Sequence, residues 1–136
     1  MKPFDINFLD HVALYVKDME QSIQWYAEVL GLTKYQLEKW GDSPVFMLSG
    51  KSGVALFPAN LQHQKIDPNS RNVRIEHFAF NVSNNDFEKA QQHFKSLDIP
   101  FDFQDHHYFH SIYLKDPDGH KVELTTIMVD ENNFYK

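Results

Sequence analysis

The sequence has no cysteine among its 136 residues, so disulfides, thiolate nucleophiles, zinc fingers and iron–sulfur clusters are all excluded. It is also poor in positive charge, because thirteen Lys and Arg face nineteen Asp and Glu and give a formal net charge of −6. That balance argues against a nucleic-acid-binding protein, which would need a basic patch. No hydrophobic run approaches membrane-spanning length, and residues 1–10 lack the apolar stretch of a signal peptide. We therefore expect a cytoplasmic protein with neither a nucleic-acid nor a membrane partner.

Aromatic residues and histidines, by contrast, are abundant. Twelve Phe, six Tyr and two Trp can supply the core of a single domain, which we expect to span residues 1–136. Eight histidines are present. Because cysteine is absent, any metal site in this protein must be built from imidazole and carboxylate ligands.

The first half of the chain shows a strand, a helix and a hairpin in sequence. Residues 11–16 alternate between two faces, which predicts a strand with His11 on the side opposite its apolar face. Asp18 is placed to cap a helix, and that helix is expected to end before Gly31. Two apolar runs within residues 45–57 predict a hairpin.

The second half repeats this order. Residues 75–82 alternate in the same way, and His77 lies opposite the apolar face. Asn85 is the predicted cap of a second helix, which ends before Pro100. Three further strands are predicted at residues 101–104, 111–115 and 121–127.

The two halves correspond position by position. His77 follows His11 by 66 residues, and Tyr113 follows Phe46 by 67. Repetition at this period indicates two copies of one structural unit. The sequence therefore predicts an α+β fold of two βαβββ modules, at about residues 8–58 and 73–127.

Three side chains that can bind a metal share equivalent faces of these modules. The helices must cover the apolar faces, so His11 and His77 lie on the opposite ones, and Glu123 on the last strand joins them. Two histidines and one carboxylate form a known divalent-metal set with open coordination positions. An offset of 67 makes Leu56 the counterpart of Glu123, and Leu56 cannot bind a metal. The predicted site is therefore coordinatively unsaturated, as catalysis requires.

Three segments, residues 9–14, 75–80 and 113–124, resemble the vicinal oxygen chelate superfamily, with an Asp-Pro-Asp-Gly turn in the last of them. That superfamily includes glyoxalase I, fosfomycin-resistance thiol transferases, extradiol dioxygenases and bleomycin-binding proteins. The resemblance implies a cupped mixed sheet with a helix on the outer face of each module. It also implies one divalent metal ion (Fe, Mn, Zn or Ni) that binds a small-molecule substrate through adjacent oxygens. The implied metal ligands are His11, His77 and Glu123.

Within this superfamily, an extradiol-type dioxygenase is the first expectation, because three protein ligands leave places for a catecholate and dioxygen. The resemblance implies that Tyr113 hydrogen-bonds a metal-bound oxygen. His63, 14 residues before His77, is the candidate general acid/base. No residue is assigned to an organic cofactor.

Other members of the superfamily remain as alternatives. A glyoxalase-type lyase is disfavoured by Leu56, which occupies the position of its usual fourth ligand. A fosfomycin-type thiol transferase is disfavoured by Ala13, where a threonine is usual, and by a tail at residues 128–136 that has no arginine. The remaining alternative is a metal-free drug- or metabolite-binding protein of the bleomycin-resistance kind.

A homodimer is also expected from the resemblance. In related proteins the site often draws ligands from two chains. In that arrangement His11 of one subunit would join His77 and Glu123 of the other.

Overall fold

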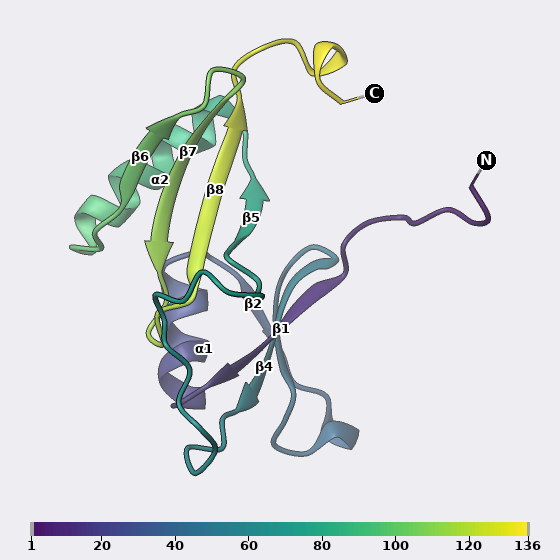
Figure 1. The fold of residues 1–136 in the computed structure, drawn as a ribbon, viewed down its shortest axis with the longest axis vertical. Helices are drawn as coiled ribbons and strands as arrows, with labels where there is room; N and C mark the ends of the chain where they lie inside the picture. The colour runs from purple at the N-terminus through teal and green to yellow at the C-terminus, as the bar shows by residue number, and fades with distance from the viewer. Residues whose placement is uncertain (1, 136) are drawn as a thin grey trace. The chain divides into compact units, whose positions relative to one another are not determined.

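The structure is a computed structural model that describes residues 2–135. The chain forms two compact units, and the boundary between them falls between Lys65 and Ile66. Each unit contains one four-stranded mixed sheet and one long helix (Figure 1). No helix within residues 2–135 has the length and apolar character needed to cross a membrane.

In the first unit the strand order across the sheet is β1-β4-β3-β2, with β1 parallel to β4 and the other pairs antiparallel. The helix α1 packs against β3 and β4. The elements are β1 (His11–Val16), α1 (Met19–Glu28), β2 (Thr33–Tyr35), the short 3-10 helix η1 (Glu38–Trp40), β3 (Val45–Ser49) and β4 (Ser52–Pro58).

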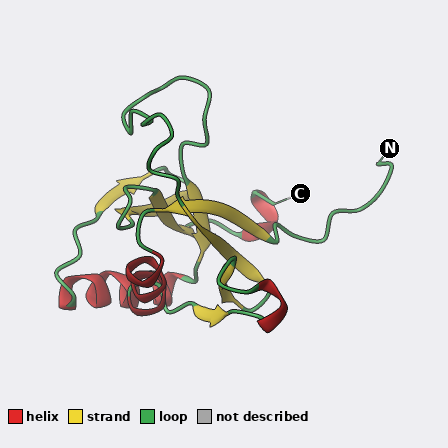
Figure 2. Ribbon diagram, turned by 90° about the horizontal axis from the view of Figure 1, so that it is seen from below, coloured by secondary structure: helices red, strands yellow, loops and turns green. Residues whose placement is uncertain are grey.

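The second unit has the same topology. Its strand order is β5-β8-β7-β6, with β5 parallel to β8, and α2 packs against β8. These elements are labelled in Figure 1, and Figure 2 shows the helices in red and the strands in yellow. The elements are β5 (Phe78–Asn81), α2 (Asn84–Ser96), β6 (Asp102–Asp105), β7 (Phe109–Lys115), β8 (Lys121–Ile127) and the short 3-10 helix η2 (Glu131–Asn133). The predicted α+β fold of two βαβββ modules is therefore confirmed.

The core of each unit lies between its helix and the apolar face of its sheet. Val16 in β1 and Val122 in β8 are fully buried, as the alternating pattern predicts. The helices contribute Tyr26 and Phe94, which are also buried. These side chains leave the other sheet face to the histidines and to Glu123.

The N-cap residue predicted from the sequence is confirmed for α1 in the first unit and is wrong for α2 in the second. The Asp18 side chain accepts a hydrogen bond of 3.0 Å from the Gln21 backbone N–H, as predicted. The prediction that Asn85 caps the second helix is wrong. Ser83 is the cap, and its Oγ accepts from the Asp86 backbone N–H at 3.1 Å. Ser83 offers the same short side-chain acceptor two positions earlier, so the helix begins sooner.

The prediction that Leu56 corresponds to Glu123 is also wrong. Glu123 lies opposite Tyr113 in the antiparallel pair, and the matching residue opposite Phe46 is Ala55. Leu56 lies opposite Val45 and faces the core.

The cause is the length of the connecting turn. At equivalent positions, Leu48 pairs with Gly53 across four residues in the first unit, whereas Lys115 pairs with Lys121 across five residues in the second. The different loop shifts the register by one residue, and a one-residue shift moves a side chain to the other face of the sheet. Because alanine cannot bind a metal either, the first unit still has no carboxylate at this position.

Candidate metal centre

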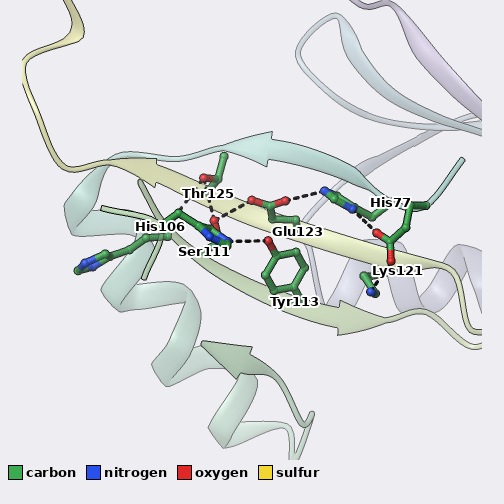
Figure 3. Close-up of polar contacts among 9 residues, drawn as sticks. His77, His106, Ser111, Tyr113, Lys121, Glu123 and Thr125 are labelled. Atoms are coloured by element: carbon green, nitrogen blue, oxygen red, sulfur yellow. Dashed lines mark hydrogen bonds and ion pairs between the residues drawn. The ribbon is translucent and has the colours of Figure 1, made fainter. Parts of the chain in front are cut away.

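Two of the predicted ligands lie side by side in the second unit. His77 Nε2 is 2.8 Å from Glu123 Oε1 (Figure 3). His77 immediately precedes β5, and the parallel pairing of β5 with β8 places Ala79 opposite Glu123. Glu123 is 8% exposed, so its carboxylate is buried in the sheet face.

This separation suits two ligands of one ion. Ligand atoms about 2.1 Å from a metal and at right angles to each other are about 3.0 Å apart. The 2.8 Å between His77 Nε2 and Glu123 Oε1 is close to that value. Imidazole nitrogen and carboxylate oxygen are also a donor pair that first-row divalent metals accept. The two residues therefore fit a divalent metal ion.

A second carboxylate holds the other nitrogen of His77. The Glu76 carboxylate contacts His77 Nδ1, and it also accepts a hydrogen bond of 2.6 Å from Lys121 Nζ. The hydrogen bond from Lys121, followed by that from His77, lowers the pKa of Glu76 to about 2. Glu76 is therefore ionised near neutral pH, and its carboxylate favours the tautomer of His77 that carries the proton on Nδ1, in which the Nε2 lone pair can bind a metal.

A hydrogen bond to the second carboxylate oxygen of Glu123, Oε2, orients this side chain. The fully buried hydroxyl of Ser111 donates a hydrogen bond of 2.7 Å to Glu123 Oε2. Thr125 Oγ1 lies 3.1 Å from the same Ser111 hydroxyl. The carboxylate is thus fixed with Oε1 toward His77, and the chain of polar contacts continues along β8 (Figure 3).

Tyr113 lies beside this pair. Its ring is 5.7 Å from the His77 ring, edge to face, and its hydroxyl is 3.0 Å from His106 Nε2. Burial, together with the charge of Glu123, raises the pKa of the Tyr113 phenol. Tyr113 therefore keeps its proton and can donate a hydrogen bond to an oxygen near His77.

The first unit repeats part of this arrangement. His11 Nδ1 is 2.7 Å from Asp10 Oδ1, as His77 is held by Glu76. The Phe46 ring lies 4.8 Å from the His11 ring, at the position that Tyr113 occupies in the second unit. The acidic residue that precedes each histidine was not predicted to have a role, although it recurs in both modules and is visible in the sequence.

His63 lies in the exposed loop that follows β4, in the first unit. Its backbone N–H donates to the Asn60 carbonyl at 3.1 Å, and its Nε2 is 3.4 Å from Asn60 Nδ2. His63 is therefore held by contacts within its own turn.

The turn between β7 and β8 contains a further group of potential ligands. Asp116, Asp118 and His120 offer atoms within 4.8 Å of one another. Asp116 Oδ1 accepts hydrogen bonds from the backbone N–H groups of Asp118 and His120, and its Oδ2 is 2.8 Å from His120 Nδ1. These bonds close the turn that leads the chain into Glu123.

Comparison with known proteins gives matches along almost the whole chain. The family model described as the Glyoxalase/Bleomycin resistance protein/Dioxygenase superfamily matches residues 8–124. The chain is 30% identical to metallothiol transferase FosB of Staphylococcus epidermidis over 139 aligned residues, covering 97% of this chain and 91% of that protein. It is 31% identical to glutathione transferase FosA of Serratia marcescens, covering 88% of this chain and 80% of that protein.

Solved structures share the fold. A glyoxalase/dioxygenase from Nostoc punctiforme superposes with a TM-score of 0.78 at 20% identity, covering 95% of this chain and 97% of that one. The fosfomycin resistance protein FosX of Listeria monocytogenes gives a TM-score of 0.68 at 18% identity, covering 93% of this chain and 98% of that one.

These matches bear on two predictions made from the sequence. The expectation of a divalent metal cofactor is confirmed at the level of the family, since the relatives include metallothiol transferases. Asp116, Asp118 and His120, which are not the predicted ligands, form a further group that could hold an ion. The reaction favoured for this chain changes, because the two sequence relatives described above, at 30% and 31% identity, are both named as thiol transferases. The comparisons thus favour the fosfomycin-type alternative over the dioxygenase that the sequence placed first.

Proposed function

The chain belongs to the Glyoxalase/Bleomycin resistance protein/Dioxygenase superfamily, and we propose that within it the protein is a divalent-metal-dependent thiol transferase. The observation that carries the proposal is the 2.8 Å approach of His77 Nε2 to Glu123 Oε1. The similarity to FosB over 97% of the chain supports the reaction class.

We assign the metal ligands as His11, His77 and Glu123. The repeat supports His11, because an acidic neighbour holds its Nδ1 as Glu76 holds that of His77. His11 would come from the same chain or from a second copy in a homodimer, and we propose a cytoplasmic homodimer as the working form. The bound ion would supply Lewis acidity to an oxygen of the substrate.

The residues around the ion would orient the metal ligands and donate a hydrogen bond to the substrate. Glu76 and Ser111 hold the ligands His77 and Glu123 in fixed orientations. Tyr113 keeps its proton and can donate a hydrogen bond to the substrate oxygen that gains charge. In the reaction a thiol sulfur forms a bond to an electrophilic carbon, the carbon–oxygen bond breaks, and the thiol proton ends on the released oxygen.

The test is thiol consumption by the metal-loaded protein. Protein reconstituted with Mn(II) or Zn(II) is incubated with an epoxide and with glutathione or cysteine, and free thiol and product mass are measured. We expect metal-dependent loss of thiol with formation of the adduct, and loss of this activity in His77→Ala and Glu123→Ala. Absence of adduct with every thiol and metal tried would refute the proposal.

A parallel assay separates thiol transfer from the dioxygenase alternative. Protein loaded with Fe(II) is incubated with catechol in air, and ring-opened product is sought. Substitution of His63 distinguishes the two reactions. An extradiol dioxygenase would use His63 as its general acid/base, whereas thiol transfer assigns no role to this residue. We expect His63→Ala to retain thiol transfer within about twofold, as a surface substitution should.

A further inference from the structure

A pocket of about 390 Å³ adjoins the metal-binding face of the second unit. This volume lies in the range of small-molecule sites. One part of its lining is polar and includes the groups that surround the metal centre. The polar lining residues are His106, Ser111, Tyr113, Glu123 and Thr125.

The other part of the lining is aromatic. Phe109 in β7 is joined by Phe134 and Tyr135, which follow η2 near the end of the chain. The Phe134 ring lies 4.7 Å from Phe109 and nearly perpendicular to it, and 5.2 Å from Tyr135. Phe134 is 46% exposed and Tyr135 is 52% exposed, so about half of each side chain is left uncovered by the protein.

Hydrogen bonds in the segment after β8 hold the aromatic wall of the pocket, formed by Phe109, Phe134 and Tyr135, in place. Met128 N–H, just after β8, donates to the Tyr108 carbonyl at 2.8 Å. The Asp130 side chain then caps η2 by accepting from Asn132 N–H at 2.8 Å. The segment after β8 therefore turns back beside the start of β7, which places its two rings next to Phe109.

The charge of the lining indicates what the pocket can take. Neither lysine nor arginine is among the residues that line it, and Glu123 contributes a carboxylate. A phosphonate group, with up to two negative charges, would lose its hydration here without gaining a cationic side chain in return. A neutral aromatic group would lose little hydration and could pack edge to face against the three rings.

We propose that this pocket binds the body of the electrophilic substrate and that this body is a neutral aromatic group rather than a phosphonate. The inference rests on the proposed function, because Glu123 is shared between the pocket and the metal centre. A substrate head with adjacent oxygens reaches the ion, and its ring lies among Phe109, Phe134 and Tyr135.

Two chelating probes with the same head and different bodies test this directly. Acetohydroxamate and benzohydroxamate both bind a metal through adjacent oxygens, and only the second carries a ring. Calorimetry on the full chain loaded with Zn(II) gives the ratio of their dissociation constants. We expect benzohydroxamate to bind about 10-fold more tightly, as one aromatic packing interaction allows.

Variants locate the source of that preference. Phe134→Ala removes a ring from the wall outside the sheet, and we expect it to reduce the ratio to about twofold or less. Tyr15→Ala removes an exposed ring from β1 of the first unit and serves as the matched control, so its ratio should equal that of the original protein. Fosfomycin is the phosphonate probe and should bind more weakly than benzohydroxamate.

The outcomes distinguish this inference from the proposed function. If both hydroxamates bind equally, if Phe134→Ala keeps the ratio, or if fosfomycin binds more tightly than benzohydroxamate, the aromatic pocket is refuted and the metal centre stands. If neither hydroxamate binds the Zn(II)-loaded protein, the metal centre fails, and the proposed function and the pocket inference fail with it.

Discussion

The hydroxyl of Ser111 donates a hydrogen bond of 2.7 Å to Glu123 Oε2 from a fully buried position. The two residues lie on adjacent strands, β7 and β8, and their contact sets the direction of the other carboxylate oxygen toward His77. A residue that hydrogen-bonds to a metal ligand in this way fixes the orientation of that ligand toward the metal.

Replacing Ser111 by alanine should therefore weaken metal binding. We expect Ser111→Ala to raise the dissociation constant for Zn(II) by about 10-fold, because outer partners of metal ligands contribute on that scale. Competition with a chelator measures this. Ser96→Ala is the control, since its hydroxyl donates to the His93 carbonyl within α2, and it should leave the metal affinity unchanged. Equal affinity in Ser111→Ala and the original protein would contradict the orienting role.

Replacing Glu76 by glutamine should also weaken metal binding. Glu76→Gln removes the carboxylate that favours the Nδ1–H tautomer of His77, and we expect a 10- to 100-fold loss of affinity, roughly the range for such partners. Glu88→Gln, an exposed position in α2, removes the same charge and is the control. NMR of the imidazole nitrogens gives an independent readout, because Glu76→Gln should shift the tautomer balance of His77 even without metal. A tautomer unchanged by the substitution would count against this assignment.

The cap of α2 offers a test of where the helix begins. Ser83→Ala should lower the free energy of unfolding by about 1 kcal/mol, the usual cost of removing a capping side chain. Asn85→Ala, the position that the sequence favoured, should cost less than about 0.5 kcal/mol. Urea unfolding of both variants measures the difference. A larger loss in Asn85→Ala than in Ser83→Ala would place the cap where the sequence first put it.

His120 should make stability depend on pH. The hydrogen bond that His120 Nδ1 donates to the Asp116 carboxylate raises the pKa of His120 above its ordinary value of 6.5. A raised pKa in the folded state means that the charged pair contributes its full stability below pH 6.5 and loses it as the pH rises through the folded-state pKa. Without metal, the difference in unfolding free energy between the original protein and His120→Gln should thus be larger at pH 6 than at pH 9. Urea unfolding at both pH values checks this, and a difference that grows toward pH 9 would be of the wrong sign.

Much of the fold followed from local patterns. The alternation of residues 11–16 predicted β1 with its bounds, and Asp18 predicted the start of α1. The repeat predicted the shared topology of the two units. These features depend on neighbours within a few positions, because a strand repeats every two residues and a helix every 3.6. The error at Leu56 arose where a loop length, which periodicity does not encode, fixed the register.

The candidate metal centre was likewise predictable from the sequence only in part. The sequence by itself determined that His77 and Glu123 occupy the face away from the helix, because alternation along a strand fixes the side of each residue. Only the tertiary structure decided which residues hold them, since Lys121 reaches Glu76 from 45 positions away. It also decided that Phe134 completes an aromatic wall beside Glu123. Such contacts depend on how strands pair and where the chain returns, and therefore on the whole fold rather than on any one segment.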